Sequence, residues 1–452
     1  MRIVILGAGQ VGGTLARNLA HEDNDITLID LNEERLRYLQ HRIDIKTVCG
    51  CASHPNVLIE AGIQQADMLI AVTDSDEINM MGCQIAYSLF RTPTKIARIR
   101  SINYYQYPKL FSNEHVSVDV CISPEQLVTE HIVNLIDYPG VSQILDFSEG
   151  RVLMATIKPE ASGLMVGQTI RQLDQHLSAI EAGVVAIFRN NEAIPLTDDC
   201  VIAKDDHVLF IASPLAIHQV LIALGRYTQP NRRIIIAGGG HIGSKLAQTL
   251  EPRYRIKVIE HNLNQANHLS SQLHKATVLQ GDIADRDLLV NENIEFTDVF
   301  CAVTNDDEAN IMSCLQAKRL GARHVLTLVN RNAYVDLIED SPIDHAISPQ
   351  LITIGSILTK LRRGNMVRVH RLQNEEAEAI ELVIRGDKQS SQIIGRRLDQ
   401  INLPPSCFIT AVVRGEKVNL ATSDYIFAAG DHVILLLLKK RYVSQIESLF
   451  QL

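Results

Sequence analysis

Residues 2–19 read RIVILGAGQVGGTLARNL, and residues 233–250 read RIIIAGGGHIGSKLAQTL. Each stretch is a short apolar run, followed by a Gly-x-Gly-x-x-Gly turn and then by a segment with helical periodicity. This is the strand–turn–helix start of a doubly wound α/β domain, and the chain contains it twice. Gly7 corresponds to Gly238, an offset of 231 residues.

Further blocks repeat along the chain. Residues 71–86, AVTDSDEINMMGCQIA, return as residues 302–317, AVTNDDEANIMSCLQA, at the same offset of 231. Later, ISPEQLVTEHI from Ile122 returns as ISPQLITIGSI from Ile347, at an offset of 225. Because several blocks recur in order, we expect two copies of one unit of about 225 residues.

The first part of each copy alternates apolar strands with amphipathic helices, which predicts a doubly wound parallel sheet. A helix that begins at Pro124, or at Pro349 in the second copy, precedes short strands with Gly and Asn turns. The predicted fold class is therefore α/β, with two tandem Rossmann-like domains, each followed by a small α+β C-terminal subdomain. The four predicted parts are residues 1–123, 124–228, 231–348 and 349–452.

Composition excludes several classes of partner. The chain has 452 residues, 46% apolar, with a net charge of −9, so nonspecific binding to nucleic acid or to an anionic bilayer is not expected. We find no membrane-spanning segment and no signal-peptide cleavage site. The eight Cys form no CxxC pair and lack His partners at zinc spacing, so we predict free thiols in a reducing cytoplasm and no metal site.

The first Gly-rich turn has the context that dinucleotide binding requires. Its glycines let backbone N–H groups approach a pyrophosphate at a helix N-terminus. Asp30, at the end of the next strand, would accept hydrogen bonds from the adenosine ribose and disfavour a 2′-phosphate, so NAD or another adenosine nucleotide is preferred over NADP. The alternative is a turn that serves only helix–strand packing. The predicted residues are Gly7, Ala8, Gly9, Gln10, Val11, Gly12 and Asp30.

The second copy keeps the same pattern, with an acidic residue at the end of its second strand. It is a second predicted nucleotide site, and the alternative is a degenerate site retained for folding. Its predicted residues are Gly238, Gly239, Gly240, His241, Ile242, Gly243 and Glu260.

One polar pair follows the fourth strand of each copy, where doubly wound folds place loops over the ligand. These pairs are Thr73-Asp74 and Thr304-Asn305, and helix capping before Glu77 or Glu308 is an equally good interpretation.

Arg98 and Arg100 lie on the fifth strand of the first copy. At the corresponding positions of the second copy we align Thr327 and Val329. An arginine here could meet phosphate charge, either within its own chain or across a subunit boundary, and an ordinary ion pair is the alternative.

A dehydrogenase would also need a proton-transfer group beside the nicotinamide. The candidates are Asp206-His207 and Asp431-His432, but each pair follows a turn-like sequence and precedes an apolar strand, which favours a structural turn. The chain contains no P-loop, HExxH, GxSxG or kinase signature. We therefore predict no catalytic residue, and an NAD-dependent oxidoreductase of unknown substrate is the alternative function.

The blocks GAGQVGGTLA, AVTDSDEIN and IARIR resemble the domains that regulate the conductance of potassium (RCK domains), and the likeness covers essentially the whole chain. The usual Gly-Asp-Ala after the third strand begins as Gly281-Asp282 in the second copy, so the resemblance adds Asp282 to that site. The first copy reads Gly50-Cys51-Ala52 instead.

The resemblance implies a non-enzymatic regulatory subunit that binds NAD(H) and the adenine nucleotides ATP and ADP. It implies a homo-oligomer, a tetrameric ring, whose partner is a potassium-translocating membrane subunit. The protein would be cytoplasmic, held at the inner face of the cell membrane by that partner and not inserted itself. Nucleotides that favour one arrangement of the lobes would gate the partner. A nucleotide-sensing subunit of a different transporter is a further alternative.

Overall fold

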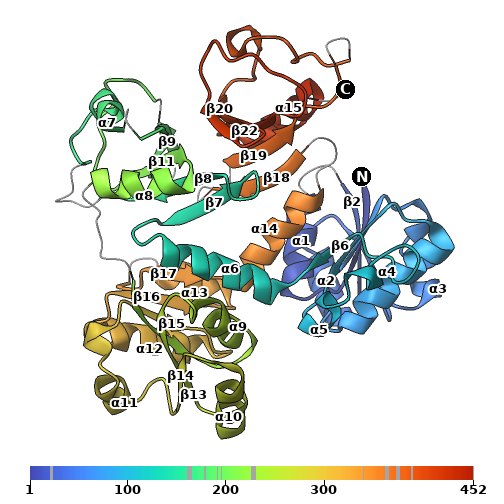
Figure 1. The fold of residues 1–452 in the computed structure, drawn as a ribbon. Helices are drawn as coiled ribbons and strands as arrows, with labels where there is room; N and C mark the ends of the chain where they lie inside the picture. The colour runs from blue at the N-terminus through green and yellow to red at the C-terminus, as the bar shows by residue number, and fades with distance from the viewer. Residues whose placement is uncertain are drawn as a thin grey trace. The chain divides into compact units, whose positions relative to one another are not determined.

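The computed structural model describes residues 1–452 except 21–23, 160–164, 178–179, 191, 195, 225–230, 339–340, 362–365, 373–376, 388–389 and 451–452. The chain forms two compact units, and each combines segments from both copies (Figure 1). The first unit contains Met1–His131 and Arg232–Ile357, and the second contains Ile132–Asn231 and Leu358–Leu452. The predicted boundary at residue 228 lies outside the described residues.

The first unit holds two parallel six-stranded sheets, one from each copy. In the first copy the strand order is β3-β2-β1-β4-β5-β6. The central strands β1 and β4 are apolar runs with almost every residue buried, as is typical of parallel sheets covered on both faces. Their bounds are β1 Arg2–Leu6, β2 Asp25–Asp30, β3 Lys46–Cys49, β4 Met68–Ala71, β5 Thr94–Arg98 and β6 Val120–Ile122.

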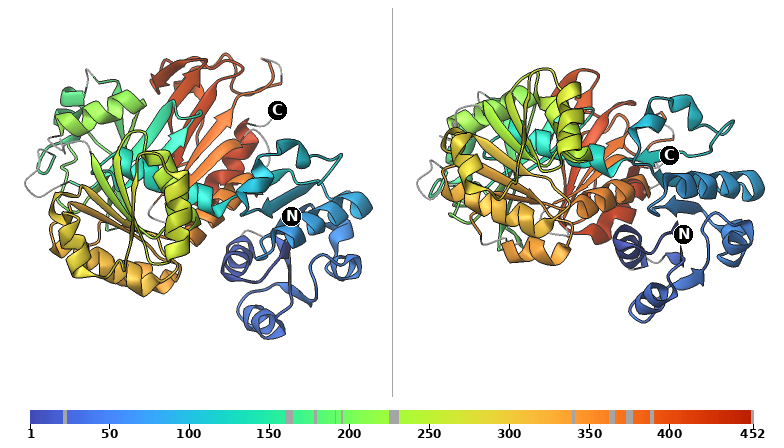
Figure 2. Two further views of the ribbon diagram at one scale, coloured as in Figure 1. Left: turned by 60° about the horizontal axis from the view of Figure 1, so that its bottom comes forward. Right: turned by 90° about the horizontal axis from the view of Figure 1, so that it is seen from below.

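Helices connect these strands on both faces of the sheet (Figure 2). Where caps are formed, short polar side chains accept the first free N–H groups: Asn32 caps α2 and Ser75 caps α4. The helices are α1 Gln10–Ala20, α2 Glu33–Gln40, α3 Pro55–Glu60, α4 Asp76–Phe90, α5 Ile102–Tyr105 and α6 Pro124–Asp137, with 3-10 turns at Ile63–Gln65 and Pro108–Leu110.

The second copy repeats this architecture with the order β14-β13-β12-β15-β16-β17. Its strands are β12 Arg233–Ala237, β13 Arg255–Glu260, β14 Thr277–Gln280, β15 Val299–Ala302, β16 His324–Leu328 and β17 His345–Ile347. Its helices are α9 His241–Leu250, α10 Leu263–Gln272, α11 Arg286–Asn291, α12 Asp307–Arg319, α13 Asn332–Ile338 and α14 Pro349–Leu361, with a 3-10 turn at Ile294–Phe296.

The second unit holds two antiparallel five-stranded sheets, with the orders β10-β9-β11-β8-β7 and β18-β19-β22-β20-β21. Side chains from both sheets form one buried cluster that includes Phe147, Met154, Ala379 and Leu436. The elements are β7 Gln143–Phe147, β8 Val152–Ile157, α7 Ile170–Leu177, β9 Ala182–Arg189, β10 Glu192–Ile194, β11 His207–Ala212, α8 Pro214–Ala223, β18 Met366–Arg371, β19 Glu378–Val383, β20 Cys407–Arg414, β21 Lys417–Leu420, β22 His432–Leu437 and α15 Val443–Phe450, with 3-10 turns at Leu398–Gln400 and Lys440–Tyr442.

The predicted fold class is confirmed, because each copy has a parallel sheet followed by a small antiparallel α+β lobe. One detail of the sequence alignment was wrong. Ala71 pairs with Ala97 in the first sheet and Ala302 pairs with Thr327 in the second, so the counterparts of Arg98 and Arg100 are Leu328 and Asn330. The alignment of Thr327 and Val329 was one residue out, because apolar strands allow a shift without an obvious mismatch. The second copy still lacks arginine at both positions.

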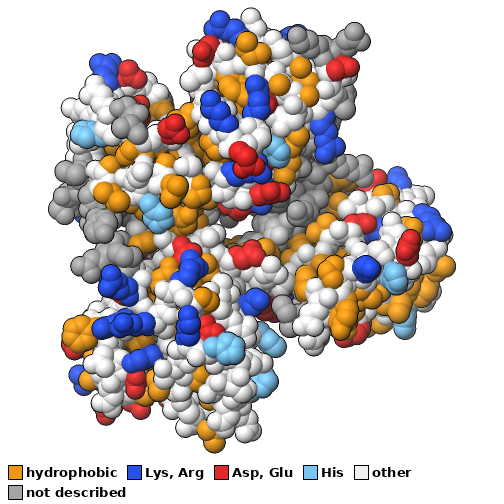
Figure 3. Space-filling view, viewed as in Figure 1, with side chains coloured by type: hydrophobic (Ala, Val, Ile, Leu, Met, Phe, Trp, Pro, Cys, Tyr) orange, Lys and Arg blue, Asp and Glu red, His pale blue; other side chains and the backbone are white. Residues whose placement is uncertain are grey.

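Charged side chains of both signs are interspersed over the face drawn in Figure 3. Among the described residues, no helix combines the length and the apolar character that crossing a membrane requires.

Candidate nucleotide-binding site

The Gly-rich turn of the first copy joins β1 to α1 and needs glycine at two positions. Gly7 has φ +100°, in the left-handed region that favours glycine. A Cβ on Gly12 would lie 1.9 Å from the carbonyl oxygen of Gly7, so the helix can approach the turn only without a side chain there. Gly9, by contrast, faces open space. This close approach of helix and strand leaves the backbone N–H groups at the start of α1 free to meet an anion.

Asp30 ends β2 beside this turn. Its Oδ2 accepts the Ala8 N–H at 2.6 Å and its Oδ1 accepts the Asn32 N–H at 2.8 Å. Each carboxylate oxygen keeps a lone pair for a further donor. The carboxylate is thus held in place while it can still accept hydroxyl groups of a ribose, which fits an adenosine nucleotide.

We call the Gly-rich turn together with the carboxylate that accepts one of its N–H groups a cradle. The second copy reproduces the cradle of the first. Gly238 has φ +110°, and a Cβ on Gly243 would lie 1.9 Å from the Gly238 carbonyl oxygen. Glu260 accepts the Gly239 N–H at 2.7 Å. The longer carboxylate reaches the loop because position 239 is glycine, where a Cβ would come within 3.0 Å of Glu260 Oε2. Both predicted sites therefore have a backbone that fits a pyrophosphate and an acidic residue that fits a ribose.

A buried asparagine shapes the loop after the fourth strand in both copies. Asn79 accepts the Thr73 N–H at 2.9 Å and the Thr73 hydroxyl at 2.7 Å, and it donates to the Arg98 carbonyl at 2.9 Å. Asn310 makes the matching bonds to Thr304 and to the Leu328 carbonyl. Both asparagines are fully buried. The sequence signal was their recurrence in the repeated AVT block, but nothing in it assigned them a role.

The hydrogen bonds to Asn79 and Asn310 indicate the structural role of Thr73 and Thr304. The helices that follow are capped by Ser75 and Asp306, whose side chains accept N–H groups of the first turn. Capping by Thr73 or Thr304 is therefore not observed. Each threonine instead holds its loop against the neighbouring strand.

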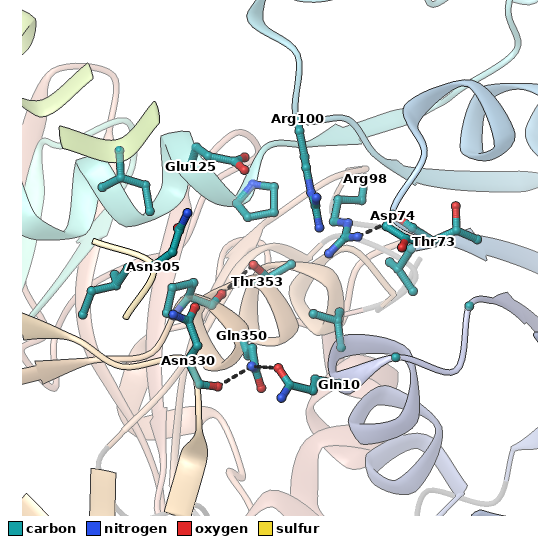
Figure 4. Close-up of a pocket in the computed structure, with 18 of the residues that line it drawn as sticks. Gln10, Thr73, Asp74, Arg98, Arg100, Glu125, Asn305, Asn330, Gln350 and Thr353 are labelled. Carbon is teal, nitrogen blue, oxygen red and sulfur yellow. Dashed lines mark hydrogen bonds between the residues drawn. The ribbon is translucent and has the colours of Figure 1, made fainter. Parts of the chain in front are cut away.

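One cavity of about 440 Å³ opens at the carboxyl ends of the strands in the first unit (Figure 4). Both copies line it, and the carboxyl ends of parallel strands are where doubly wound folds bind ligands. Of the predicted site residues, the cavity brings together Gly7, Gly9, Gln10, Val11, Asp30, Thr73, Asp74, Arg98, Ile242 and Asn305. The predicted residues that do not line it are Ala8, Gly12, Gly238, Gly239, Gly240, His241, Gly243, Glu260, Asp282 and Thr304.

Sequence reasoning did not predict several residues of this cavity as ligand contacts. From the first copy they are Arg35 and Glu125, and from the second copy Asn330, Gln350 and Thr353. Pro124 and Pro349, at the predicted helix starts, place the first turns of α6 and α14 in the cavity wall. The pairing of ISPEQ with ISPQL was a signal that these turns are equivalent, but it did not show that they face one cavity.

Arg98 and Arg100 bring two positive charges to the first-copy end of the cavity, which Asp30 and Asp74 also line. Arg98 donates through Nη2 to the Thr73 carbonyl at 2.6 Å, and its buried Nε has no hydrogen-bond partner. Burial and the neighbouring Arg100 lower the pKa of Arg98 to about 10, so the side chain is still charged at neutral pH. In the described part of the chain neither guanidinium is in an ion pair. An anion in the cavity would supply the missing partner.

The turns after the third strands differ between the copies. Asp282 accepts the Ala284 N–H at 2.9 Å within its own turn. Cys51, at the matching place, lies 3.3 Å from the Ser53 hydroxyl, and hydrogen bonds from Ser53 lower the pKa of its thiol. All eight cysteines are free, and no cluster of potential metal ligands occurs among the described residues.

The aspartates of the two Asp-His pairs are bound within turns of the second unit. Asp206 accepts two hydrogen bonds from Arg189, at 2.7 and 2.9 Å, and one from the Ala203 N–H. Burial raises the pKa of Asp206, but these bonds outweigh burial and lower it. Asp431 makes the same arrangement with Arg414. Both carboxylates are occupied in turns, as the sequence pattern indicated.

Comparison with known protein families agrees with the repeated architecture. The TrkA-N domain model matches residues 3–124 and again residues 234–349, and the TrkA-C domain model matches residues 388–451. The chain belongs to the TrkA family. The two TrkA-N matches contain the two cradles, and the TrkA-C match lies in the second antiparallel lobe.

Curated relatives in the TrkA family match over the full length. The Trk system potassium uptake protein TrkA of Halomonas elongata is 51% identical over 451 residues, covering 100% of this chain and 99% of the relative. The protein of the same name from Vibrio alginolyticus is 48% identical over 452 residues, with the same coverage.

Solved structures show the same fold at low identity. The RCK domain of GsuK has a TM-score of 0.61 at 18% identity, covering 99% of this chain and 94% of that one. The GsuK channel bound to NAD has a TM-score of 0.62 at 17% identity, covering 99% and 78%. At this identity the likeness concerns the fold alone.

Proposed function

We propose that this chain is a nucleotide-binding regulatory subunit of a potassium uptake system, without catalytic activity of its own. The observation that carries the proposal is the doubled cradle, in which a glycine turn and a carboxylate recur in both copies of a TrkA-family chain. The full-length relatives named as potassium uptake proteins support the choice of system.

The proposed ligands are NAD(H) and the adenine nucleotides ATP and ADP. Residues 1–123 and 231–348 are the proposed nucleotide-binding lobes, and residues 124–228 and 349–452 are the connecting helices with the C-terminal lobes. The proposed contacts are those predicted from the sequence, with the turn N–H groups at the pyrophosphate and Asp30 or Glu260 at the ribose. The NAD-bound GsuK channel, a structure of similar fold, supports this choice of ligand.

The proposed assembly is a homotetrameric ring on a potassium-translocating membrane subunit, at the inner face of the cell membrane. Nucleotides bias the partner only if they bind one arrangement of the lobes more tightly than another. A difference of about 1–3 kcal/mol would change the open population roughly 5- to 150-fold. Helices α6 and α14 each begin in the first unit and end in the second, so a shift at the nucleotide end can reach the C-terminal lobes along them.

Potassium flux through the reconstituted membrane subunit tests this function. The flux is measured with and without this protein, over titrations of NAD, NADH, ADP and ATP. We expect a nucleotide-dependent change with the intact protein, and the change is expected to be weakened with Asp30→Ala. A flux that does not respond to any nucleotide would contradict the regulatory role.

Recovery of the nucleotide distinguishes this function from the oxidoreductase alternative. A regulator returns bound NADH unchanged, whereas an oxidoreductase consumes it when a substrate is present. Incubation with NADH and a set of small carbonyl compounds, followed by absorbance at the nicotinamide band, gives the result directly.

A further inference from the structure

Gln350 is a buried amide that joins the two copies at the nucleotide cavity. It is the second residue of α14, and only 9% of its surface is exposed. Its Nε2 donates to the side-chain oxygen of Gln10 in the first copy and to the Asn330 carbonyl in the second, as Figure 4 shows. A buried amide needs hydrogen-bond partners, and both partners of Gln350 line the cavity.

Gln10 places this contact beside the first cradle. It is the first residue of α1, within the Gly7–Gly12 turn whose N–H groups fit a pyrophosphate. An adenosine monophosphate ends at this turn when its ribose is at Asp30. A ligand that continues past the first phosphate would extend into the cavity that Gln350 lines together with Arg98 and Arg100.

The chemistry of position 350 suits an anionic ligand. The matching residue of the first copy, at the same place in α6, is Glu125, which lines the same cavity. A carboxylate can only accept hydrogen bonds and repels phosphate, whereas an amide can donate two. The second copy thus presents a neutral donor to the first copy's cradle, opposite the charged guanidinium of Arg98.

We propose that Gln350 of the second copy is a specificity-determining residue of the first copy's nucleotide site. Its carboxamide exchanges its bond to Gln10 for oxygen atoms of the ligand beyond the first phosphate. The site therefore favours nucleoside diphosphates, triphosphates and dinucleotides over nucleoside monophosphates, and binding is completed by both copies. This inference rests on the proposed nucleotide-binding function.

Calorimetric titration of the full-length chain with AMP, ADP and NADH tests the proposal. The Glu260→Ala background removes the second site, so that binding reports on the first. Gln350→Ala should weaken ADP and NADH binding roughly 3- to 30-fold, as expected for the loss of one hydrogen bond near a charged group. AMP binding should change less than about twofold. Gln350→Glu should weaken ADP and NADH binding further, relative to AMP binding, because it places a carboxylate near the phosphates beyond the first.

Gln126→Ala is the matched control. Gln126 is the next residue after Glu125 on the homologous helix α6 and is exposed. Among the described residues its side chain bonds only to Glu130, and its backbone N–H donates to the Ser123 hydroxyl, a bond that the substitution keeps. Its substitution should leave all three affinities unchanged.

Equal losses for AMP and NADH, or no loss for either, would overturn the role of Gln350. If Gln350→Ala does not fold, as judged by circular dichroism, the near-isosteric Gln350→Glu provides the same comparison.

Asp30→Ala distinguishes a failure of the proposed nucleotide site from a failure of the proposed role of Gln350. If it leaves first-site binding intact, the proposed nucleotide site itself is wrong. If it abolishes binding while Gln350 variants keep the AMP-to-NADH ratio, only the role of Gln350 is wrong.

Discussion

The two copies share one cradle but differ at its phosphate end. Gly7 and Gly238 both have positive φ, and Asp30 and Glu260 both accept an N–H group of the Gly-rich turn. Beyond the turn, the first copy has Arg98, Arg100 and Asp74, whereas the second has Leu328, Asn330 and Asn305. The backbone scaffold has thus been retained after duplication, while the charge has diverged. The difference teaches that a shared fingerprint predicts a site but not its ligand preference.

The first test concerns the shared scaffold and has the largest expected effect. In Gly12→Ala and in Gly243→Ala, the new Cβ would lie 1.9 Å from a backbone carbonyl oxygen. We expect each to destabilise the first unit by about 3 kcal/mol or more, since the backbone must move. Urea unfolding followed by circular dichroism measures the loss.

Gly9→Ala and Gly240→Ala are the controls for this test, because nothing lies within 4 Å of a Cβ at either position. Each should cost less than about 1 kcal/mol. A large loss in one copy and none in the other would show that the two turns are not equivalent.

The buried asparagines provide the second test of the shared scaffold. Asn79→Ala leaves the Thr73 N–H and the Arg98 carbonyl without their partner, and Asn310→Ala does the same in the second copy. Each substitution should cost about 2–3 kcal/mol, because buried polar groups lose their hydrogen bonds. Thermal unfolding of the two variants measures the loss. Unequal values would show that the two loops are held differently.

The divergent phosphate ends provide the third test. In the Glu260→Ala background, Arg98→Leu should weaken ATP binding to the first copy about tenfold, as expected for the loss of one charge-assisted contact. Arg98→Lys should recover part of the loss, because it keeps the charge but not the planar fork. ATP titrations at two salt concentrations test whether the lost charge of Arg98 causes the weaker binding. The salt dependence should be smaller in the Leu variant, and an unchanged dependence would exclude charge as the reason.

The fourth test has the smallest expected effect and concerns the last strand of each parallel sheet, β6 in the first copy and β17 in the second. The second copy has His345 on β17 where the first has Val120 on β6. Burial lowers the pKa of His345 to about 4, helped by nearby His131, His324 and Lys318 against the opposing charge of Asp344. An unfolded histidine has a pKa of about 6.5, so the unfolded state binds more protons between these values. Stability should therefore fall as the pH falls from about 6.5 to 4.

His345→Val gives the second copy the residue of the first. It should reduce the acid-induced loss of stability by about 1 kcal/mol, measured by urea unfolding at pH 7 and pH 5. His131, whose pKa burial also lowers to about 4, remains in this variant and should keep part of the loss. An acid sensitivity equal to that of the intact chain would rule out His345 as its source.

Much of the fold could be predicted because it depends on local pattern. The strand before Gly7, the helix that begins at Gln10 and the acidic end of β2 are close in sequence, and their spacing alone predicts the cradle. The repeat then predicts the second cradle. The register of β16 was predicted one residue out, because Thr327, Leu328 and Val329 all suit a buried strand. Only the hydrogen-bonded pairing with β15 decides which of them matches Arg98.

The sequence by itself determined that this protein is a duplicated, acidic, doubly wound chain with two glycine cradles. Hydrophobic periodicity and turn chemistry depend on residues that are close in sequence, so they can be recognised from the sequence itself. The tertiary structure alone decided that both copies line one cavity, and that Gln350 bonds to Gln10 across 340 positions of the chain. Such a contact depends on how two folded lobes pack together. The sequence patterns of α1 and α14 therefore give no indication of this contact.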